Sequence, residues 1–395
     1  MATQEVAIKA NLQIFLKAEA EVLDEVMVVA YGTAKKASFT GAASTISAKK
    51  ILKDIPINSF EEVLQGSAPG VTVNSNSGQP GAALSIRLRG TGSMNAGNEP
   101  LYVIDGIPVV SGDVAVSGVS GDTKSFNIMS SLNPSDIENI TILKDAAAAS
   151  LYGSRAANGV VLITTKRGEK GKVKINVKTG FSWNTPVKVP EYANAYDWAS
   201  LANEALEGRY ESPLYTSEEM NIIRYGLDSD LYPNVDWRDL MLKSGAPSYY
   251  ANINFSGGSD NVRYFVSGQY TSEDGRYRTS SSENKYNTNT TYERWNYRAN
   301  VDMNLTRSTI LKVSVGGWLV NRNSPQSDAD DIWKSFAYYT PLSSPRKWST
   351  GQWPVVNGMT TPEYQMTQTG YRTICFGSGL VVYNERLEIF RSLCF

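Results

Sequence analysis

Histidine is absent from the whole chain of 395 residues. This excludes every mechanism that needs an imidazole as base, nucleophile or metal ligand, including Ser-His-Asp hydrolysis and His-based zinc sites. Cysteine is scarce as well, since only Cys375 and Cys394 are present and both lie in the last stretch. A Cys metal cluster and a disulfide framework are therefore excluded. No acidic pair stands at a spacing typical of carboxylate hydrolases, so we expect no enzyme, no catalytic residue, no metal and no cofactor.

Long apolar runs and an excess of charge are also missing. Nowhere do about 18 apolar residues follow one another, so we expect no membrane-spanning helix. Lys and Arg together number 38 against 39 acidic residues, which leaves no net field to attract nucleic acid. Residues 1–20 alternate as a strand does, without the charged head and apolar core of a signal peptide. If the protein is exported, its signal has been lost or the chain begins internally.

What the chain does contain is tyrosine, tryptophan and glycine, with 22, 8 and 32 residues, while only 19% of residues are charged. This composition favours extended β-structure over a helical enzyme. From Lys172 onward, apolar and polar residues alternate with period two, which predicts strands at 172–181, 249–255, 262–270, 295–305 and 311–319. Strands of about ten residues with one apolar and one strongly polar face are typical of a transmembrane β-barrel with a wet interior. A soluble sandwich also alternates, but seldom needs so uniform a set of Arg, Lys and Asn.

The connections between these strands alternate in length. Gly257–Asn261 and Thr306–Thr309 are short, whereas Asn184–Pro247 and Ser272–Arg294 are long. Bacterial barrels alternate in the same way, with short turns facing the periplasm and long loops facing outside. The pattern therefore predicts which end of each strand faces the cell exterior.

A different unit lies upstream, at Asn133–Arg167. Its aliphatic runs predict two strands around a short helix, with Asp145 at the N-cap, Ala146–Leu151 as helix formers and Gly153 at the left-handed end. Before it come LSIRLRG, from Leu84 to Gly90, and PLYVIDGIPV, from Pro100 to Val109.

In this order, the three segments resemble the plug domain of TonB-dependent outer-membrane transporters. LDEVMVVAYGT and LYGSRAANGVVLITTKRG resemble, more narrowly, the SusC/RagA family of Bacteroidetes nutrient importers. The resemblance covers Val22 to Gly168 and implies an α+β plug domain followed by antiparallel transmembrane β-barrel strands. It divides the chain into a remnant of an N-terminal carboxypeptidase-regulatory-like β-domain (1–21), a TonB-box segment (22–35), the plug domain (36–168), the first part of the barrel with long extracellular loops (169–373) and an atypical tail (374–395).

The barrel is expected to be incomplete. Plugged transporters close with roughly 22 strands, but only about five are predicted before the pattern ends at Asn321. An open sheet in lipid leaves backbone groups unsatisfied, so this chain cannot form the pore by itself. Cys375 to Phe395 shows no alternation, which favours a truncation or frame change near Thr373 and an N-terminal fragment of a transporter.

The segment ahead of the plug is the candidate TonB box by its position in the family. A short β-prone peptide can add as a strand to a partner's sheet edge through backbone hydrogen bonds. The alternative is that it forms the first strand of the plug. The candidate residues are Asp24, Glu25, Val26, Met27, Val28 and Val29.

Two arginines are candidates for contacts between plug and barrel. Period two places Arg87 and Arg89 on the face of one strand opposite Leu84, Ile86 and Leu88. In an unknown β-protein such a pair is a solvated edge. The family resemblance implies instead that these guanidiniums hold the plug to the barrel wall through carboxylates.

Aromatic residues crowd two of the long connecting segments. One contains Tyr192, Tyr196, Trp198 and Trp237, and the segment after Val320 contains Trp333, Tyr338, Tyr339, Trp348 and Trp353. Aromatic faces can stack on sugars or pack against one another within a loop. We take Trp333, Trp348 and Trp353 as the candidate substrate contacts.

The function implied by this resemblance is TonB-dependent import of a nutrient, an oligosaccharide or a peptide, across the bacterial outer membrane. The implied partners are TonB with its inner-membrane energising complex, a SusD-like lipoprotein, the substrate and the lipid bilayer. The implied location is the outer membrane. The alternative is a truncated, plug-like binding module that does not transport.

Overall fold

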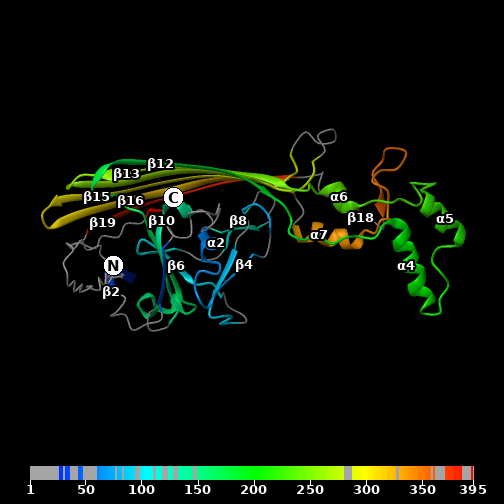
Figure 1. Cartoon of the computed structure of the whole chain (residues 1–395), viewed down its shortest axis with the longest axis horizontal. Coiled ribbons are helices and arrows are strands. Elements are labelled where there is room, and N and C mark those ends of the chain that lie inside the picture. Colours follow the sequence, from blue (N-terminus) through cyan, green and yellow to red (C-terminus); the bar gives the residue numbers. More distant parts are fainter. Residues whose placement is uncertain are drawn as a thin grey trace, which may run out of the picture.

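The computed structural model describes most of the chain from Val26 onward. Residues 1–25, which include the predicted β-remnant and Asp24 and Glu25, lie outside it. The described ranges are 26–29, 32–35, 43–47, 60–75, 78–81, 84–93, 98–109, 113–117, 123–127, 132–145, 149–279, 287–325, 329–356, 359–360, 370–384 and 393–394. Within them a small N-terminal domain lies beneath one face of a sheet of long strands, and a helical lobe extends beyond one end of that sheet (Figure 1).

The N-terminal domain contains a five-stranded mixed sheet in the order β3-β10-β11-β6-β7. Strands β6 and β11 are parallel, and the other neighbours are antiparallel. The bounds are β3 (Ala43–Ser47), β6 (Leu101–Ile104), β7 (Ile107–Val109), β10 (Ile137–Leu143) and β11 (Val160–Thr165). The two aliphatic runs of the 133–167 unit are therefore strands, as the sequence predicted, and the structure places them next to each other in the sheet.

Both faces of this sheet are buried, which explains why Val160–Ile163 is apolar without alternation. Val161 and Ile163 pack with Ile140 into one cluster, and Val160 and Leu162 into a second cluster on the other face. Helix α2 (Phe60–Leu64) and β5 (Leu84–Leu88) contribute Leu64 and Ile86 to the first cluster. Buried apolar clusters thus cover both faces of the sheet.

Residues 146–148 of the predicted helix lie outside the described residues, so its N-cap at Asp145 stays a prediction. Ala149 is α-helical, and a 3-10 helix, η4 (Ser150–Ala156), follows with Ala149 as its N-cap. The Asp145 carbonyl oxygen accepts a hydrogen bond from the Ala149 amide at 2.9 Å, as in the first turn of an α-helix. Gly153 has φ 68° and ψ −157° at a kink inside η4, a positive-φ conformation that glycine adopts without strain but not the left-handed helix end that the sequence predicted. The remaining short elements are β1 (Val26–Val29) with β2 (Gly32–Lys35), β4 (Val71–Ser75) with β5, β8 (Asp113–Ser117) with β9 (Thr123–Asn127), and η3 (Pro134–Asp136).

The long sheet is an antiparallel meander in which neighbours in the sheet are successive long strands of the chain. Its order is β12-β13-β14-β15-β16-β19-β20. The bounds are β12 (Gly171–Asn184), β13 (Ala246–Gly258), β14 (Val262–Asp274), β15 (Thr291–Thr306), β16 (Thr309–Pro325), β19 (Gly370–Asn384) and β20 (Leu393–Cys394). All five predicted strands are present and longer than predicted. The alternation of short and long connections is present as well.

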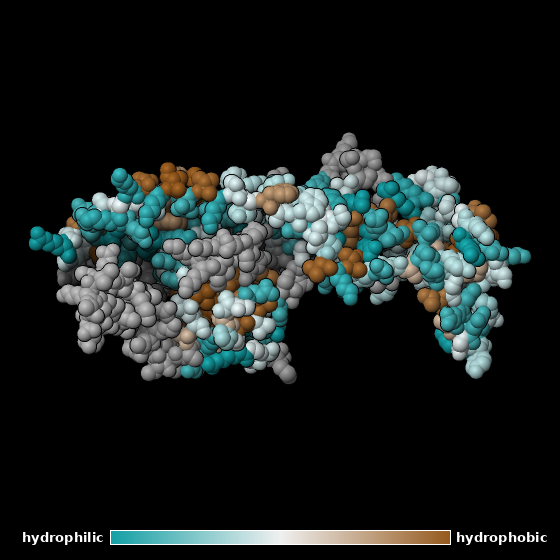
Figure 2. Space-filling model, in the orientation of Figure 1, coloured by the Kyte–Doolittle hydropathy of each residue, from teal (hydrophilic) through white to brown (hydrophobic). Residues whose placement is uncertain are grey.

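The sheet has the reverse polarity of a soluble protein. Its outward face is apolar and exposed, with Ile175 60% and Trp295 56% accessible. Its other face, toward the N-terminal domain, buries Asn252, Gln269 and Asn300. In Figure 2 brown hydrophobic atoms gather along the upper side of the molecule, over this sheet. An apolar exterior around a polar interior is the arrangement of a transmembrane barrel wall.

Two further strands of the long sheet, β19 and β20, were not predicted. The alternation predicted that strands end at Val320, but β16 continues to Pro325 and pairs along its length with β19. The centre of β19 reads Gly377-Ser378-Gly379, small residues that carry no signal of period two. The first part of the tail predicted to be atypical is therefore a strand of the long sheet.

The long connections contain helices. Between β12 and β13 lie α4 (Ala195–Glu207), α5 (Ser217–Tyr225) and α6 (Trp237–Met241), and after β16 comes α7 (Ala329–Tyr338). The short strands β17 (Val355–Val356) and β18 (Met359–Thr360) follow α7 in the chain and pair with each other. We call residues 185–245 and 329–360 the lobe. Among the described residues, no helix combines the length and apolar character that a membrane span requires.

Candidate functional site

The N-terminal domain meets the polar face of the long sheet through one central arginine. Arg298, on β15, lies 3.7 Å from Asp105 (Nη1 to Oδ2) and 3.8 Å from Asp136 (Nε to Oδ2). The side chains of Arg298, Asp105 and Asp136 are only 16%, 9% and 3% accessible. We call these three residues the Arg298 cluster. One cation of the sheet thus lies between two carboxylates of the N-terminal domain.

Local sequence places each carboxylate. Asp105 and Gly106 have φ 48° and 88° in the turn between β6 and β7, and positive φ at both central residues is what a two-residue hairpin turn requires. The Asp105 carboxylate is fixed by Thr165, whose amide and hydroxyl donate to it at 2.9 and 2.6 Å. Asp136 ends η3, which Asn133 caps, and Asn133 Nδ2 donates to Asp136 Oδ1 at 3.1 Å.

The protonation of Asp136 depends on this surrounding. Burial raises the pKa of the Asp136 carboxyl above its ordinary value, and the positive charge of Arg298 acts in the opposite direction. The hydrogen bond from Asn133 also favours the charged form. The positive charge of Arg298 therefore partly offsets the rise in the pKa of the Asp136 carboxyl that burial causes.

A second group of contacts lies next to the Arg298 cluster. Arg167 Nη1, just after β11, donates to Asp302 Oδ1 on β15 at 2.6 Å. Asn300 Nδ2, between the two, donates to Thr165 Oγ1 at 2.8 Å and to the Lys166 carbonyl at 2.7 Å. Alternate residues of one strand face, 298, 300 and 302, therefore all bind the N-terminal domain.

The chain passes very close to the sheet at Gly168. A Cβ added to Gly168 would lie 2.2 Å from the Tyr264 amide nitrogen, on β14. Toward the lobe, Gly81 N donates to Glu273 Oε2 at 3.3 Å, and Gln79 contacts Tyr277 and Arg322 at 3.5 Å. These longer bonds mark a looser edge of the same interface.

Residues 35–160 match the family model described as TonB-dependent Receptor Plug Domain. The chain is 37% identical over 311 residues to TonB-dependent receptor P26 of Formosa agariphila, covering 77% of this chain and 28% of that protein. It is 34% identical over 279 residues to TonB-dependent receptor SusC of Bacteroides thetaiotaomicron, covering 70% of this chain and 25% of SusC.

The chain belongs to the SusC/RagA type of TonB-dependent receptors. Its fold matches a solved structure of the RagAB peptide importer in the open-open state, with a TM-score of 0.64 at 22% identity, over 91% of this chain and 40% of that one. The N-terminal domain is the plug, and the long sheet is an unclosed part of the barrel. The chain spans about a quarter of the length of these curated relatives. Receptors of this family are transporters and not enzymes.

The two predicted plug arginines contact residues of the plug. Arg87 Nη1 donates to Thr91 Oγ1 at 3.3 Å, and Arg89, just beyond β5 with φ 59°, lies 4.0 Å from Asp145. Their contact with the barrel wall stays a prediction. Arg298 and Arg167 make such contacts in the structure, and sequence reasoning did not single them out. The available signals were an arginine on the polar face of a strand and the Asp-Gly turn at Asp105.

The candidate TonB box lies partly in a hairpin. Val26–Val29 forms β1, which pairs with β2 so that Val28 lies opposite Thr33. The segment therefore adopts the extended backbone that strand addition requires. Its role as a TonB box stays a prediction.

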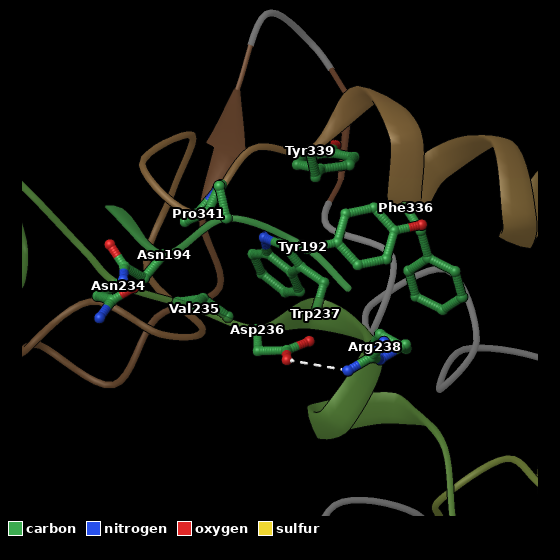
Figure 3. Close-up of a pocket in the computed structure, with 11 residues that line it drawn as sticks. Tyr192, Asn194, Asn234, Val235, Asp236, Trp237, Arg238, Phe336, Tyr339 and Pro341 are labelled. Atoms are coloured by element: carbon green, nitrogen blue, oxygen red, sulfur yellow. Dashed lines mark ion pairs between the residues drawn. The ribbon is translucent and has the colours of Figure 1, made fainter. Parts of the chain in front are cut away.

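The predicted substrate tryptophans do not share one site. Trp333 packs edge-on against Phe336 at 5.4 Å, Trp348 is partly exposed, and the Trp353 ring lies 4.5 Å from Lys347 Nζ. None of the three lines the cavity of about 250 Å³ that lies between α6 and α7. Different aromatic residues surround that cavity (Figure 3).

Proposed function

We propose that the chain acts in the TonB-dependent import of a nutrient, an oligosaccharide or a peptide, across the bacterial outer membrane. The observation that carries the proposal is the reversed polarity of the long sheet, with the plug seated on its polar face. An apolar exterior suits lipid, and a polar interior lets a hydrated solute pass once the plug moves. The curated relatives bear the names of TonB-dependent receptors, which supports the same reading.

The contacts between plug and barrel suit a stopper that has to move. The described contacts around Arg298 and Arg167 are ion pairs and hydrogen bonds, and water can replace both kinds of partner when the plug shifts. Hydrogen bonds to charged groups contribute about 1.5–3 kcal/mol each. A few such bonds hold the plug against thermal motion and remain within reach of an external mechanical pull.

The partners follow from the same proposal. TonB, energised from the inner membrane, would capture β1 by adding it as a strand to its own sheet, so that affinity comes from backbone hydrogen bonds. A SusD-like lipoprotein would cover the lobe from outside. The RagAB structure, described as a peptide importer, supports a two-protein assembly for this fold.

A matched pair of substitutions tests the proposal. Val28→Pro removes a backbone donor from β1, whereas Val28→Ile keeps the backbone and the β-propensity. In a strain whose growth depends on the full-length receptor, Val28→Pro should abolish uptake at an unchanged level in the outer membrane, and Val28→Ile should retain it. Equal uptake by both variants would contradict TonB coupling through β1.

A further inference from the structure

The lobe contains a cavity that the transport proposal does not use. It has a volume of about 250 Å³ and lies between the segment ahead of α4, helix α6 and helix α7. Figure 3 shows its lining drawn from these segments, with aromatic rings on one side and amide groups on the other. Two regions far apart in the sequence therefore form one hollow.

The floor of the cavity carries an unused donor. The Trp237 side chain is 3% accessible, and its Nε1 is buried without a hydrogen-bond partner among the described residues. In Figure 3 this nitrogen points into the space between Pro341 and Tyr339. A buried donor left without a partner lowers stability, and a ligand oxygen bound there would remove that penalty.

Aromatic rings provide the apolar part of the wall. The Trp237 and Tyr339 rings lie 5.7 Å apart at an interplanar angle of 57°. Tyr192 stands at the rim, 46% accessible, with the Arg238 guanidinium 5.7 Å from its ring centroid. Exposed aromatic faces next to polar groups suit a flat ligand that has both C–H and O–H groups.

The charges of the cavity are already paired. Arg238 Nη2 lies 3.6 Å from Asp236 Oδ2, and Arg238 Nη1 donates to the Pro190 carbonyl. Asn194 and Asn234 add neutral amides. A ligand with a free carboxylate or ammonium group would find its counter-charge engaged elsewhere, so the lining favours a neutral ligand over a charged peptide end.

We infer that this cavity is a binding site for one pyranose ring of a neutral oligosaccharide. One ring hydroxyl oxygen accepts a hydrogen bond from Trp237 Nε1, and the sugar's C–H face lies on the Tyr192 ring. The inference rests on the proposed function in that the bound glycan is cargo, and it selects the oligosaccharide over the peptide. Binding at the cavity, however, requires neither TonB nor movement of the plug.

Calorimetry on the full-length receptor in detergent tests the site with maltohexaose, cellohexaose, mannohexaose and a phenylalanine-containing tripeptide as probes. Trp237→Phe keeps a ring and removes the donor, and Trp198→Phe, in α4, is its matched control. At least one hexasaccharide should bind, about 5-fold more weakly after Trp237→Phe and about 10-fold more weakly after Tyr192→Ala, with Trp198→Phe unchanged. Because Tyr192 is at the rim, its variant still reports on the site if Trp237→Phe does not fold.

The inference is overturned if no hexasaccharide binds, if neither substitution weakens binding, or if only the tripeptide binds and depends on these residues. Its failure is separable from failure of the transport proposal, since Val28→Pro should leave equilibrium binding at the cavity unchanged while it stops uptake. If no glycan binds at the cavity but TonB-dependent uptake is intact, only the cavity assignment is overturned.

Discussion

Arg298→Met should loosen the plug more than any other single change in the Arg298 cluster. It keeps most of the side-chain length but leaves Asp136 and Asp105 without their cation. Removing one partner of a buried ion pair destabilises by about 3–5 kcal/mol, and Asp105 keeps its two bonds from Thr165. We therefore expect about 3 kcal/mol at neutral pH, the low end of that range. This corresponds to about a 100-fold rise in the population of the undocked plug.

The effect should depend on pH in a defined direction. Burial raises the pKa of Asp136 in the folded receptor, and loss of Arg298 should raise it further. A carboxyl whose folded-state pKa lies above its unfolded value contributes stability below the unfolded pKa and loses it as pH rises through the folded pKa. Acidification through that window should therefore protonate Asp136 and restore part of the docking that Arg298→Met removes.

Hydrogen–deuterium exchange of the full-length receptor measures this directly. Amides of β11 and η3 should exchange faster in Arg298→Met at pH 7, and the difference from wild type should shrink at pH 5 once intrinsic exchange rates are corrected. Arg307→Met, in the short turn between β15 and β16, is the control and should match wild type. Equal protection of wild type and Arg298→Met at pH 7, or a difference that grows at pH 5, would refute the reasoning.

Two further predictions concern the surface of the sheet and its junction with the plug. Ile175→Lys places a charge on the apolar outer face, where Ile175 is 60% accessible. The substitution should lower barrel stability by about 2–4 kcal/mol if the site lies near the bilayer midplane. Heat-modifiability on gels should show this loss of stability, and an unchanged stability would argue against lipid contact. Gly168→Ala places a Cβ 2.2 Å from the Tyr264 amide nitrogen, so the thermal unfolding temperature should fall, whereas Gly351→Ala, in open space in the lobe at φ 81°, should show only the smaller effect of backbone strain, about 1–2 kcal/mol.

The sequence predicted what depends on local pattern. Alternation identified five strands of the long sheet, and the spacing of short and long connections gave the meander. It missed β19, because Gly377-Ser378-Gly379 gives neither an apolar nor a polar signal. It also read the segment before β13 as loop, although Thr216 and Glu219 form a capping box and Gly226 has φ 60° at the end of α5.

The sequence did not predict which residues far apart in the chain contact each other. Arg167 and Asp302 are separated by 135 residues, and no periodicity says which strand of the sheet meets which turn of the plug. The assignment of substrate contacts to Trp333, Trp348 and Trp353 stays a prediction. The sequence also did not indicate that Trp237 and Tyr192, from one long connection, line a cavity together with Phe336 and Tyr339, from the other. These contacts depend on how the plug packs on the sheet and how the two long connections pack on each other.

The meander has a consequence for how the receptor assembles. The described contacts that seat the plug come from β14, β15, β16 and the connections beside them, all within the stretch of chain that directly follows the plug. Hairpins closed by short turns zip quickly because little loop entropy is lost. We therefore expect this part of the wall to be able to hold the plug before the rest of the sheet is added.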